Sequence, residues 1–271
     1  MKTDLAKKAS VLFSGGTDST LAAYLIGRRV RQLTLLTFEP KHVLFIENSR
    51  RHVQKLAVAL PDVEIHHEII PVQKNIRKIL LSDLAGDWKK YGFNLTALVC
   101  LGCRMAMHAA AVIYNLENEI PVIVDGSIRY QSTVPEQLPS FIRRNREKLW
   151  ARYGIRHYSP IYEVADSDRR LDTLGISSKG GLKKQFILFD TQPTCLFGVP
   201  ADVYARLFYG ALSGPAREVD SYEYSTEKYP LVSKVIADHF DGKNPGLDEL
   251  ASNLRMQSEK LSAQWKDVSH D

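Results

Sequence analysis

Two groups of residues in this chain of 271 residues have the types and spacing needed for chemistry. The first is a loop of hydroxyl, glycine and acidic residues near the N-terminus. It consists of Ser14, Gly15, Gly16, Thr17, Asp18, Ser19 and Thr20. The second is a set of three cysteines, in which Cys100 and Cys103 form a CxxC pair and Cys195 stands apart. The loop is typical of anion binding, and the cysteines are typical of a metal or catalytic site.

The loop predicts a phosphate site. The adjacent glycines Gly15 and Gly16 allow positive φ angles and let backbone amides approach an anion, while a following helix adds the positive end of its dipole. Asp18 is an acid within an anion site, which is favourable when a cation bridges it to the phosphates, so the sequence predicts Mg²⁺. Further hydrogen-bond donors are the hydroxyls of Ser14, Thr17, Ser19 and Thr20.

The cysteines predict a three-thiolate metal site. An odd number of cysteines argues against a disulfide framework. The CxxC pair is expected to open a helix, whose N-terminus would favour thiolates, and Cys195 should return to the same end of the fold. A closed zinc site needs a fourth ligand, for which His108 is the candidate, whereas a [4Fe-4S] cluster would leave one iron open. The alternative is that the cysteines are small buried apolar residues.

The elements around these residues alternate between strand and helix. Apolar and β-branched runs predict strands, and apolar residues at helical spacing predict helices. We expect strands at 9–13, 32–38, 63–70 and 121–124, and helices at 21–26, 49–60, 71–88 and 101–116. This alternation predicts an α/β fold with a doubly wound, Rossmann-like parallel sheet. Ligands bind beyond the carboxyl ends of such strands, so Asp125, which follows the last strand, falls on the ligand side.

The string from Ser14 to Ser19, between a strand and a helix, resembles the SGGxDS signature of the PP-loop ATP pyrophosphatases. The GxxxxGK[ST] spacing of kinases and GTPases is absent. The resemblance extends from Ala9 to about Gly198. It implies that the loop holds the pyrophosphate part of ATP while a substrate oxygen attacks the α-phosphate. It further implies that adenine and the phosphates contact Phe38, Asp125, Gly126 and Ser127.

The cysteine pattern is similar to that of the iron-sulfur-dependent tRNA thiolation enzymes of the TtcA and TtuA type. By that resemblance Cys100, Cys103 and Cys195 ligate a [4Fe-4S] cluster and act with Asp18 as catalytic residues. It implies an ATP-dependent sulfurtransferase that adenylates a carbonyl oxygen, of a tRNA base or a small molecule, and replaces it with sulfur from a donor. AMP and pyrophosphate are released. Thr17 departs from the pattern, because many thiolating members have lysine there.

Two other functions remain open. One is an ammonia-using PP-loop enzyme of the 7-cyano-7-deazaguanine synthase type, in which the cysteines would bind structural zinc, although that family has four cysteines close together. The other is a nucleotide-binding module that senses ATP without turning it over. A sensor would need neither a metal-bridging acid such as Asp18 nor a reactive metal site.

Charge and composition bear on partners and organisation. The net charge of +5 favours a polyanionic partner. The basic segment 141–156 is either a solvated helix face or a surface that binds tRNA phosphates. We expect a PP-loop catalytic domain at 1–198 and a mostly helical C-terminal appendage at 199–271. The composition predicts a cytoplasmic protein without a membrane span, and a homodimer is left open. The basic residues of the segment are Arg143, Arg144, Arg146, Lys148, Arg152 and Arg156.

Overall fold

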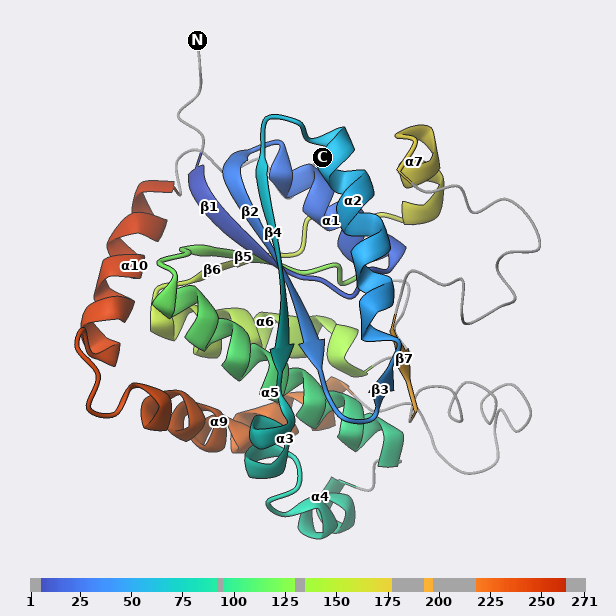
Figure 1. Cartoon of the computed structure of the whole chain (residues 1–271). Coiled ribbons are helices and arrows are strands. Elements are labelled where there is room, and N and C mark those ends of the chain that lie inside the picture. Colours follow the sequence, from blue (N-terminus) through green and yellow to red (C-terminus); the bar gives the residue numbers. More distant parts are fainter. Residues whose placement is uncertain (1–5, 92–94, 130–134, 177–192, 197–217, 262–271) are drawn as a thin grey trace, which may run out of the picture.

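The computed structural model describes residues 6–91, 95–129, 135–176, 193–196 and 218–261. Its centre is a five-stranded parallel sheet with the order β4-β2-β1-β5-β6 (Figure 1). This order confirms the predicted doubly wound α/β fold. The strands are β1 (Ala6–Leu12), β2 (Val30–Glu39), β4 (Glu64–Pro71), β5 (Val122–Val124) and β6 (Arg156–Tyr158). The sequence did not predict β6, because it is three residues long and begins where the basic segment ends.

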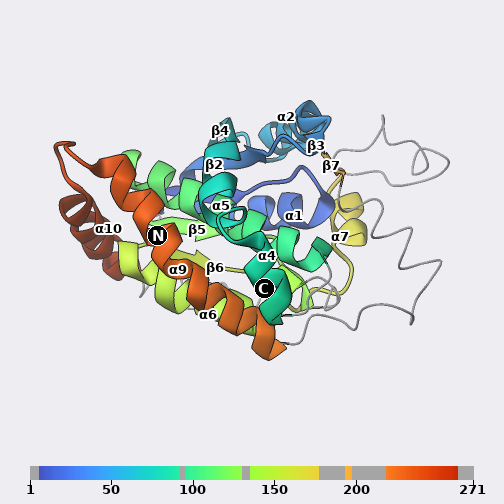
Figure 2. The same ribbon diagram turned by 90° about the horizontal axis from the view of Figure 1, so that it is seen from below.

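Helices cover both faces of the sheet, as Figures 1 and 2 show. One face carries α1 (Thr17–Gly27), α2 (Arg50–Ala59) and α7 (Ser167–Thr173). On the other face lie α3 (Gln73–Ile79), α5 (Leu95–Glu117), α6 (Pro139–Asn145) and α9 (Glu218–Phe240). Alternate residues of one strand serve opposite faces: in β2, Leu35 packs with the first group and Leu36 with the second. Strands buried on both faces explain the continuous apolar runs in the sequence.

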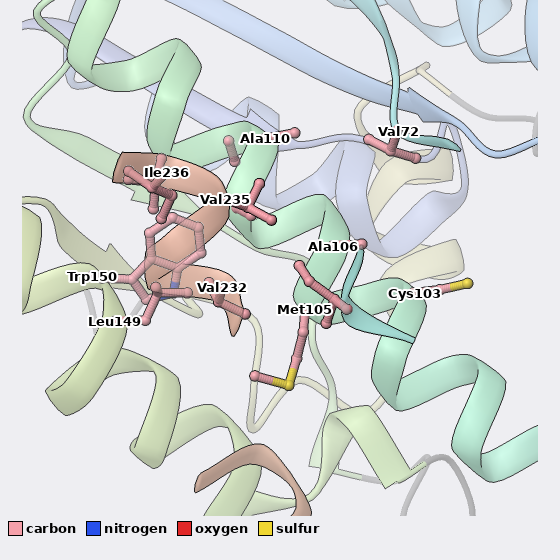
Figure 3. Close-up of a cluster of buried hydrophobic side chains, with 14 of the residues drawn as sticks. Val72, Cys103, Met105, Ala106, Ala110, Leu149, Trp150, Val232, Val235 and Ile236 are labelled. Carbon is pink, nitrogen blue, oxygen red and sulfur yellow. The ribbon is translucent and has the colours of Figure 1, made fainter. Parts of the chain in front are cut away.

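The longest core element is α5. By length and composition Ala97–Glu117 could cross a membrane, but 72% of its most apolar window is buried inside the protein. Its small residues, such as Ala106 and Ala110, are buried and let neighbouring elements approach. Figure 3 shows Val232, Val235 and Ile236 gathered with Leu149 and Trp150 beside this helix. We therefore interpret α5 as a core helix.

Two predicted helices have different bounds. The single helix expected at 71–88 is divided into α3 and α4 (Leu84–Tyr91). The division falls at Asp83, whose side chain accepts a hydrogen bond from the backbone N–H of Gly86 and so favours a new helix start. The helix expected from 101 begins at Leu95 instead. Because this helix continues to Glu117, both cysteines of the CxxC pair lie inside it.

The described part of the C-terminal region is helical, as expected. It consists of α9 and α10 (Leu247–Leu261), and both helices contribute buried side chains to the same core as α5. The basic segment runs through α6, the π-helical η4 (Arg146–Trp150) and the short η5 (Ala151–Tyr153) before it enters β6. The predicted domain boundary at 198 lies outside the described residues and stays a prediction.

Candidate functional site

The phosphate loop lies where the strand order reverses, between β1 and β5. It follows β1 directly, and α1 begins at Thr17. Asp18, Ser19 and Thr20 therefore belong to the first turn of α1. The first backbone N–H groups of a helix have no partner within it, whereas the N–H of Thr20 already donates to the carbonyl of Gly16 at 3.0 Å. The carboxyl ends of β1 and β5, next to a helix N-terminus, are the usual ligand position in this fold, and we call this position the crevice.

Hydrogen bonds within the loop fix its shape. Gly15 has a φ of 77°, which glycine adopts without strain. The N–H of Gly16 donates to Ser14 Oγ at 3.2 Å, and the N–H of Ser14 donates to Ser19 Oγ at 3.2 Å. The hydroxyls of Ser19 and Thr20 donate to the carbonyl of Gly16 at 3.1 and 2.7 Å. These hydroxyls hold the loop together, and their contacts with phosphate stay a prediction.

His52 of α2 supports the same loop. Its ring is buried, and Nδ1 lies 2.7 Å from the carbonyl oxygen of Gly15 and 3.0 Å from Thr20 Oγ1. Since a carbonyl oxygen only accepts, Nδ1–H donates to Gly15. Sequence reasoning missed His52. The sequence signal that could have identified it is the position of a histidine one helical turn before the buried Leu56, on the face of α2 that packs on the sheet.

Asp125 is the buried acid of the crevice. Its carboxylate lies 2.9 Å from His157 Nε2 and 3.5 Å from the Arg104 guanidinium, and it accepts a hydrogen bond from the N–H of Ser127 at 3.1 Å. Burial by itself would raise the pKa of Asp125. The charges of His157 and Arg104, with the His157 hydrogen bond, outweigh burial and hold the pKa well below its ordinary value. Asp125 is therefore an anion at neutral pH.

The loop after β5 lies directly against the start of α1. A β-carbon added to Gly126 would lie 2.6 Å from the backbone nitrogen of Ser19, which no real β-carbon tolerates. Glycine at this position thus lets the two predicted ATP loops meet. Phe38, near the end of β2, stands opposite Ile70 of β4 and is partly buried against the core.

The CxxC pair lies on α5 but not at its N-terminus. Because the helix begins at Leu95, Cys100 and Cys103 lie beyond its first turn, where the positive end of the dipole has little effect. Burial raises the pKa of Cys103 to about 12, and it raises that of Cys100 further. The expectation that the helix terminus favours thiolates at this pair is therefore wrong.

A two-stranded ribbon brings Cys195 toward this pair. β3 (Val43–Leu44) pairs with β7 (Thr194–Cys195), so that Cys195 stands opposite Val43. The backbone carbonyl of His42, just before β3, accepts a hydrogen bond from the N–H of Leu196 at 2.9 Å, and the Nε2 of His42 lies 3.5 Å from Cys103 Sγ. The three thiols lie near enough that Cys195 adds to the rise of both other pKa values. The ribbon therefore brings Cys195 near the CxxC pair on α5.

The metal site itself stays a prediction. Among the residues that the structure describes, no three His, Cys, Asp or Glu side chains form a group able to hold a metal ion. His108, the expected fourth ligand, contacts Asn145 Oδ1 at 3.2 Å, and its ring centroid lies 4.9 Å from that of Trp150. His42, rather than His108, is the imidazole beside Cys103.

Arg104 connects the cysteines with the crevice. It follows Cys103 in sequence, and its guanidinium reaches Asp125. The CxxC end of α5 and the crevice therefore share one edge of the sheet.

The basic segment is less uniform than its sequence indicates. Arg144 donates a hydrogen bond to Thr226 Oγ1 at 3.1 Å, and its guanidinium lies over the rings of Tyr222 and Tyr229.

One comparison with known proteins bears on this site. Residues 5–134, which include both crevice loops and the CxxC pair, match the family of the thiamine biosynthesis protein ThiI. This match supports the PP-loop superfamily and a nucleotide-binding fold. A predicted subunit of a tRNA methyltransferase from Methanocaldococcus jannaschii has 19% identity and a TM-score of 0.42, with 61% of this chain and 75% of that chain covered. That likeness carries no functional conclusion. No curated protein matches.

Proposed function

With the PP-loop superfamily as the premise, we propose that this chain is an ATP-dependent sulfurtransferase that thiolates a tRNA base. One observation carries the proposal: Arg104, next to Cys103 in the sequence, reaches Asp125 in the crevice. An activation site for ATP and a cysteine site for sulfur would then open on the same edge of the sheet. The proposed location is the cytoplasm, where tRNA and ATP are both present.

In the proposed reaction the crevice activates a carbonyl oxygen. This oxygen attacks the α-phosphorus of ATP, the bond from that phosphorus to the bridging oxygen breaks, and pyrophosphate leaves. Backbone N–H groups at the start of α1 would stabilise the departing charge. Asp18 would hold Mg²⁺, which supplies a positive charge between the pyrophosphate and the acid. His52 would keep Gly15 in the conformation that presents these amides.

The second half-reaction exchanges oxygen for sulfur. Sulfur at the oxidation level of sulfide adds to the adenylated carbon, and AMP leaves with the former carbonyl oxygen. Atoms and charges balance without an oxidant. Activation is needed because a carbonyl oxygen is a poor leaving group, whereas AMP is a good one. Asp125 would fix Arg104 beside the α-phosphate, where its guanidinium can stabilise negative charge.

Cys100, Cys103 and Cys195 would hold the proposed [4Fe-4S] cluster. Thiols are the protein ligands that such clusters take, so the donor set fits. When bound, the cluster would supply an iron without a protein thiolate, at which sulfide can be carried. The ribbon of β3 and β7 would position Cys195 for this role, since it ties Cys195 to the α5 end through His42.

A second candidate is favoured by the contact between His42 and Cys103. Three thiolates and one imidazole are a common closed ligand set for zinc. In that case the cysteines would be structural, and the adenylated oxygen would be displaced by ammonia. This function keeps every role proposed for the crevice and changes only the nucleophile.

Metal analysis tests the proposal. Protein purified without oxygen should contain about four irons and four sulfides per chain. We expect Cys195→Ala to lose them and still bind ATP, whereas Asp18→Asn should keep them and stop releasing AMP. Zinc in the wild type, lost in His42→Ala, would support the ammonia-using enzyme instead. An intact protein that binds ATP but releases no AMP with any tRNA would overturn tRNA as the acceptor.

A further inference from the structure

A cavity lies at the sheet edge formed by β6. It has a volume of about 560 Å³ and is bounded by η5, β6 and α10. Figures 1 and 2 show α10 at this end of the sheet. The volume is within the range of roughly 300–1,000 Å³ typical of ligand pockets. The residues that matter for its chemistry are Arg146, Arg156, His157, Arg255, Ser258 and Glu259.

Positive charge dominates the cavity, with three arginines against the carboxylate of Glu259 among its lining residues. Within the described part of the chain, Arg146, Arg156 and Arg255 form no ion pair with any carboxylate. The Nε of Arg156 is buried without a hydrogen-bond partner there. Arg255 donates to the carbonyl of Arg152 at 3.0 Å. Guanidinium groups without acidic partners favour an anionic ligand, above all phosphate.

The cavity wall is built by close packing. Gly154 has a φ of 71°, and a β-carbon there would lie 2.5 Å from the backbone nitrogen of Arg255 and 2.5 Å from the carbonyl oxygen of Ala251. Glycine therefore lets α10 approach the turn before β6. That approach places Arg255 and Ser258, which come from the C-terminal helix, opposite arginines of the basic segment.

The edge strand adds backbone groups. On its inner side, the N–H of Arg156 donates to Pro121, and the carbonyl of Tyr158 accepts from Asp125. In a parallel strand alternate residues face opposite neighbours, so the N–H and carbonyl of His157 face the outer edge, where the cavity lies. An N–H group in the lining of a cavity that also has three arginines is a further donor for a phosphate oxygen.

We propose that this cavity binds phosphates of the RNA backbone, and the proposal rests on the tRNA acceptor of the proposed function. Exposed basic residues continue from the cavity along the same segment, at Arg143, Lys148 and Arg152, as a polymer of phosphates requires. The cavity is also near the chemistry. Neighbouring strands are about 4.8 Å apart, and β6 adjoins β5, whose end carries Asp125.

The test compares two double variants of the full chain. Arg146→Gln with Arg255→Gln removes two exposed guanidiniums of the cavity, and Arg31→Gln with Arg77→Gln removes two exposed guanidiniums on β2 and α3. Affinity for labelled bulk tRNA would be measured by fluorescence anisotropy at salt concentrations from about 50 to 200 mM. Unchanged thermal melting and ATP binding would show that each variant is folded.

We expect the cavity variant to bind tRNA roughly tenfold more weakly, with a salt slope smaller by about 1 to 2, because two phosphate contacts are lost. The control variant should bind like the wild type. Equal loss in both variants, or none in the cavity variant, would overturn the proposal. The proposal would also be overturned if inorganic phosphate or AMP stabilised the wild type but not the cavity variant against thermal melting, while the tRNA affinity of the variant was unchanged. If the wild type binds no tRNA, the acceptor in the proposed function fails as well.

Discussion

At the scale of residues, buried polar side chains support the groups that form the crevice. Asp125 is enclosed, and His157 and Arg104 hold it as an anion. The ring of His157 in turn stacks on Trp150, with an interplanar angle of 15°. His52 acts in the same manner on the phosphate loop, through its hydrogen bond to Gly15. Such supporting groups fix the geometry of a site without touching the reacting atoms.

The charge of Asp125 makes a prediction for stability. In Asp125→Asn the His157 and Arg104 partners lose their anion, so we expect the free energy of unfolding at pH 7 to fall by roughly 3 kcal/mol. Since the folded pKa of Asp125 lies below its unfolded value of about 3.9, its contribution is present above that value and is lost as the pH falls through the folded pKa.

Urea unfolding at several pH values measures this effect. The difference between the wild type and Asp125→Asn should be constant from about pH 7 to 5 and should narrow below about pH 4. Asp62→Asn is the control, because Asp62 is exposed and its substitution should change the free energy by less than about 0.5 kcal/mol. A difference that grows on acidification would show that Asp125 is not held as an anion.

At the scale of elements, the crevice depends on how closely the loop after β5 approaches α1. Gly126 faces the backbone of Ser19, so the contact has no side chain that could move aside. The ribbon of β3 and β7 has a comparable role at the cysteines, where two short strands align Cys195 with the end of α5. Both contacts join segments that are far apart in sequence.

Gly126→Ala tests the first contact. The added methyl group must displace either the loop or the start of α1, so we expect a loss of about 1–3 kcal/mol in stability and at least a tenfold weaker binding of ATP. Gly246→Ala is the matched control, since a β-carbon there has its nearest neighbour at 3.9 Å. Calorimetric titration with ATP and urea unfolding provide the two measurements. Normal ATP binding by Gly126→Ala would place the nucleotide elsewhere.

At the scale of the whole molecule, the C-terminal helices share the core of the sheet. Val232 and Ile236 of α9 are fully buried, and they pack in one cluster with Trp150 and residues of α5 (Figure 3). The arginine cavity depends on the same arrangement, because α10 forms one of its walls. Unfolding of this region should therefore be coupled to that of the sheet.

Ile236→Ala measures this coupling. We expect the free energy of unfolding to fall by about 2–5 kcal/mol, in a single transition seen equally by circular dichroism and tryptophan fluorescence. Met256→Ala on α10 is the control, because Met256 is 53% exposed and its loss should have little effect. A separate early transition, with the sheet and ATP binding intact, would show an independent C-terminal unit.

The sequence by itself determined four of the five strands of the sheet and the position of the glycine loop after β1. Apolar runs and apolar residues at helical spacing are local patterns, and the apolar runs predicted β1, β2, β4 and β5 in their observed places. The string from Ser14 to Ser19 could likewise be interpreted without the rest of the chain, because glycine conformation and the start of α1 are local properties. The sequence also placed Asp125 on the ligand side, since the ends of parallel strands share one edge.

Only the tertiary structure decided which distant side chains meet. His52, His157 and His42 acquire their partners through packing between elements 20 or more residues apart, and no spacing in the sequence reports such contacts. The local pattern likewise did not predict the start of α5, and with it the position of Cys100 and Cys103 within the helix. The arginine cavity has the same origin, because its walls come from a short edge strand and from a helix about 100 residues later.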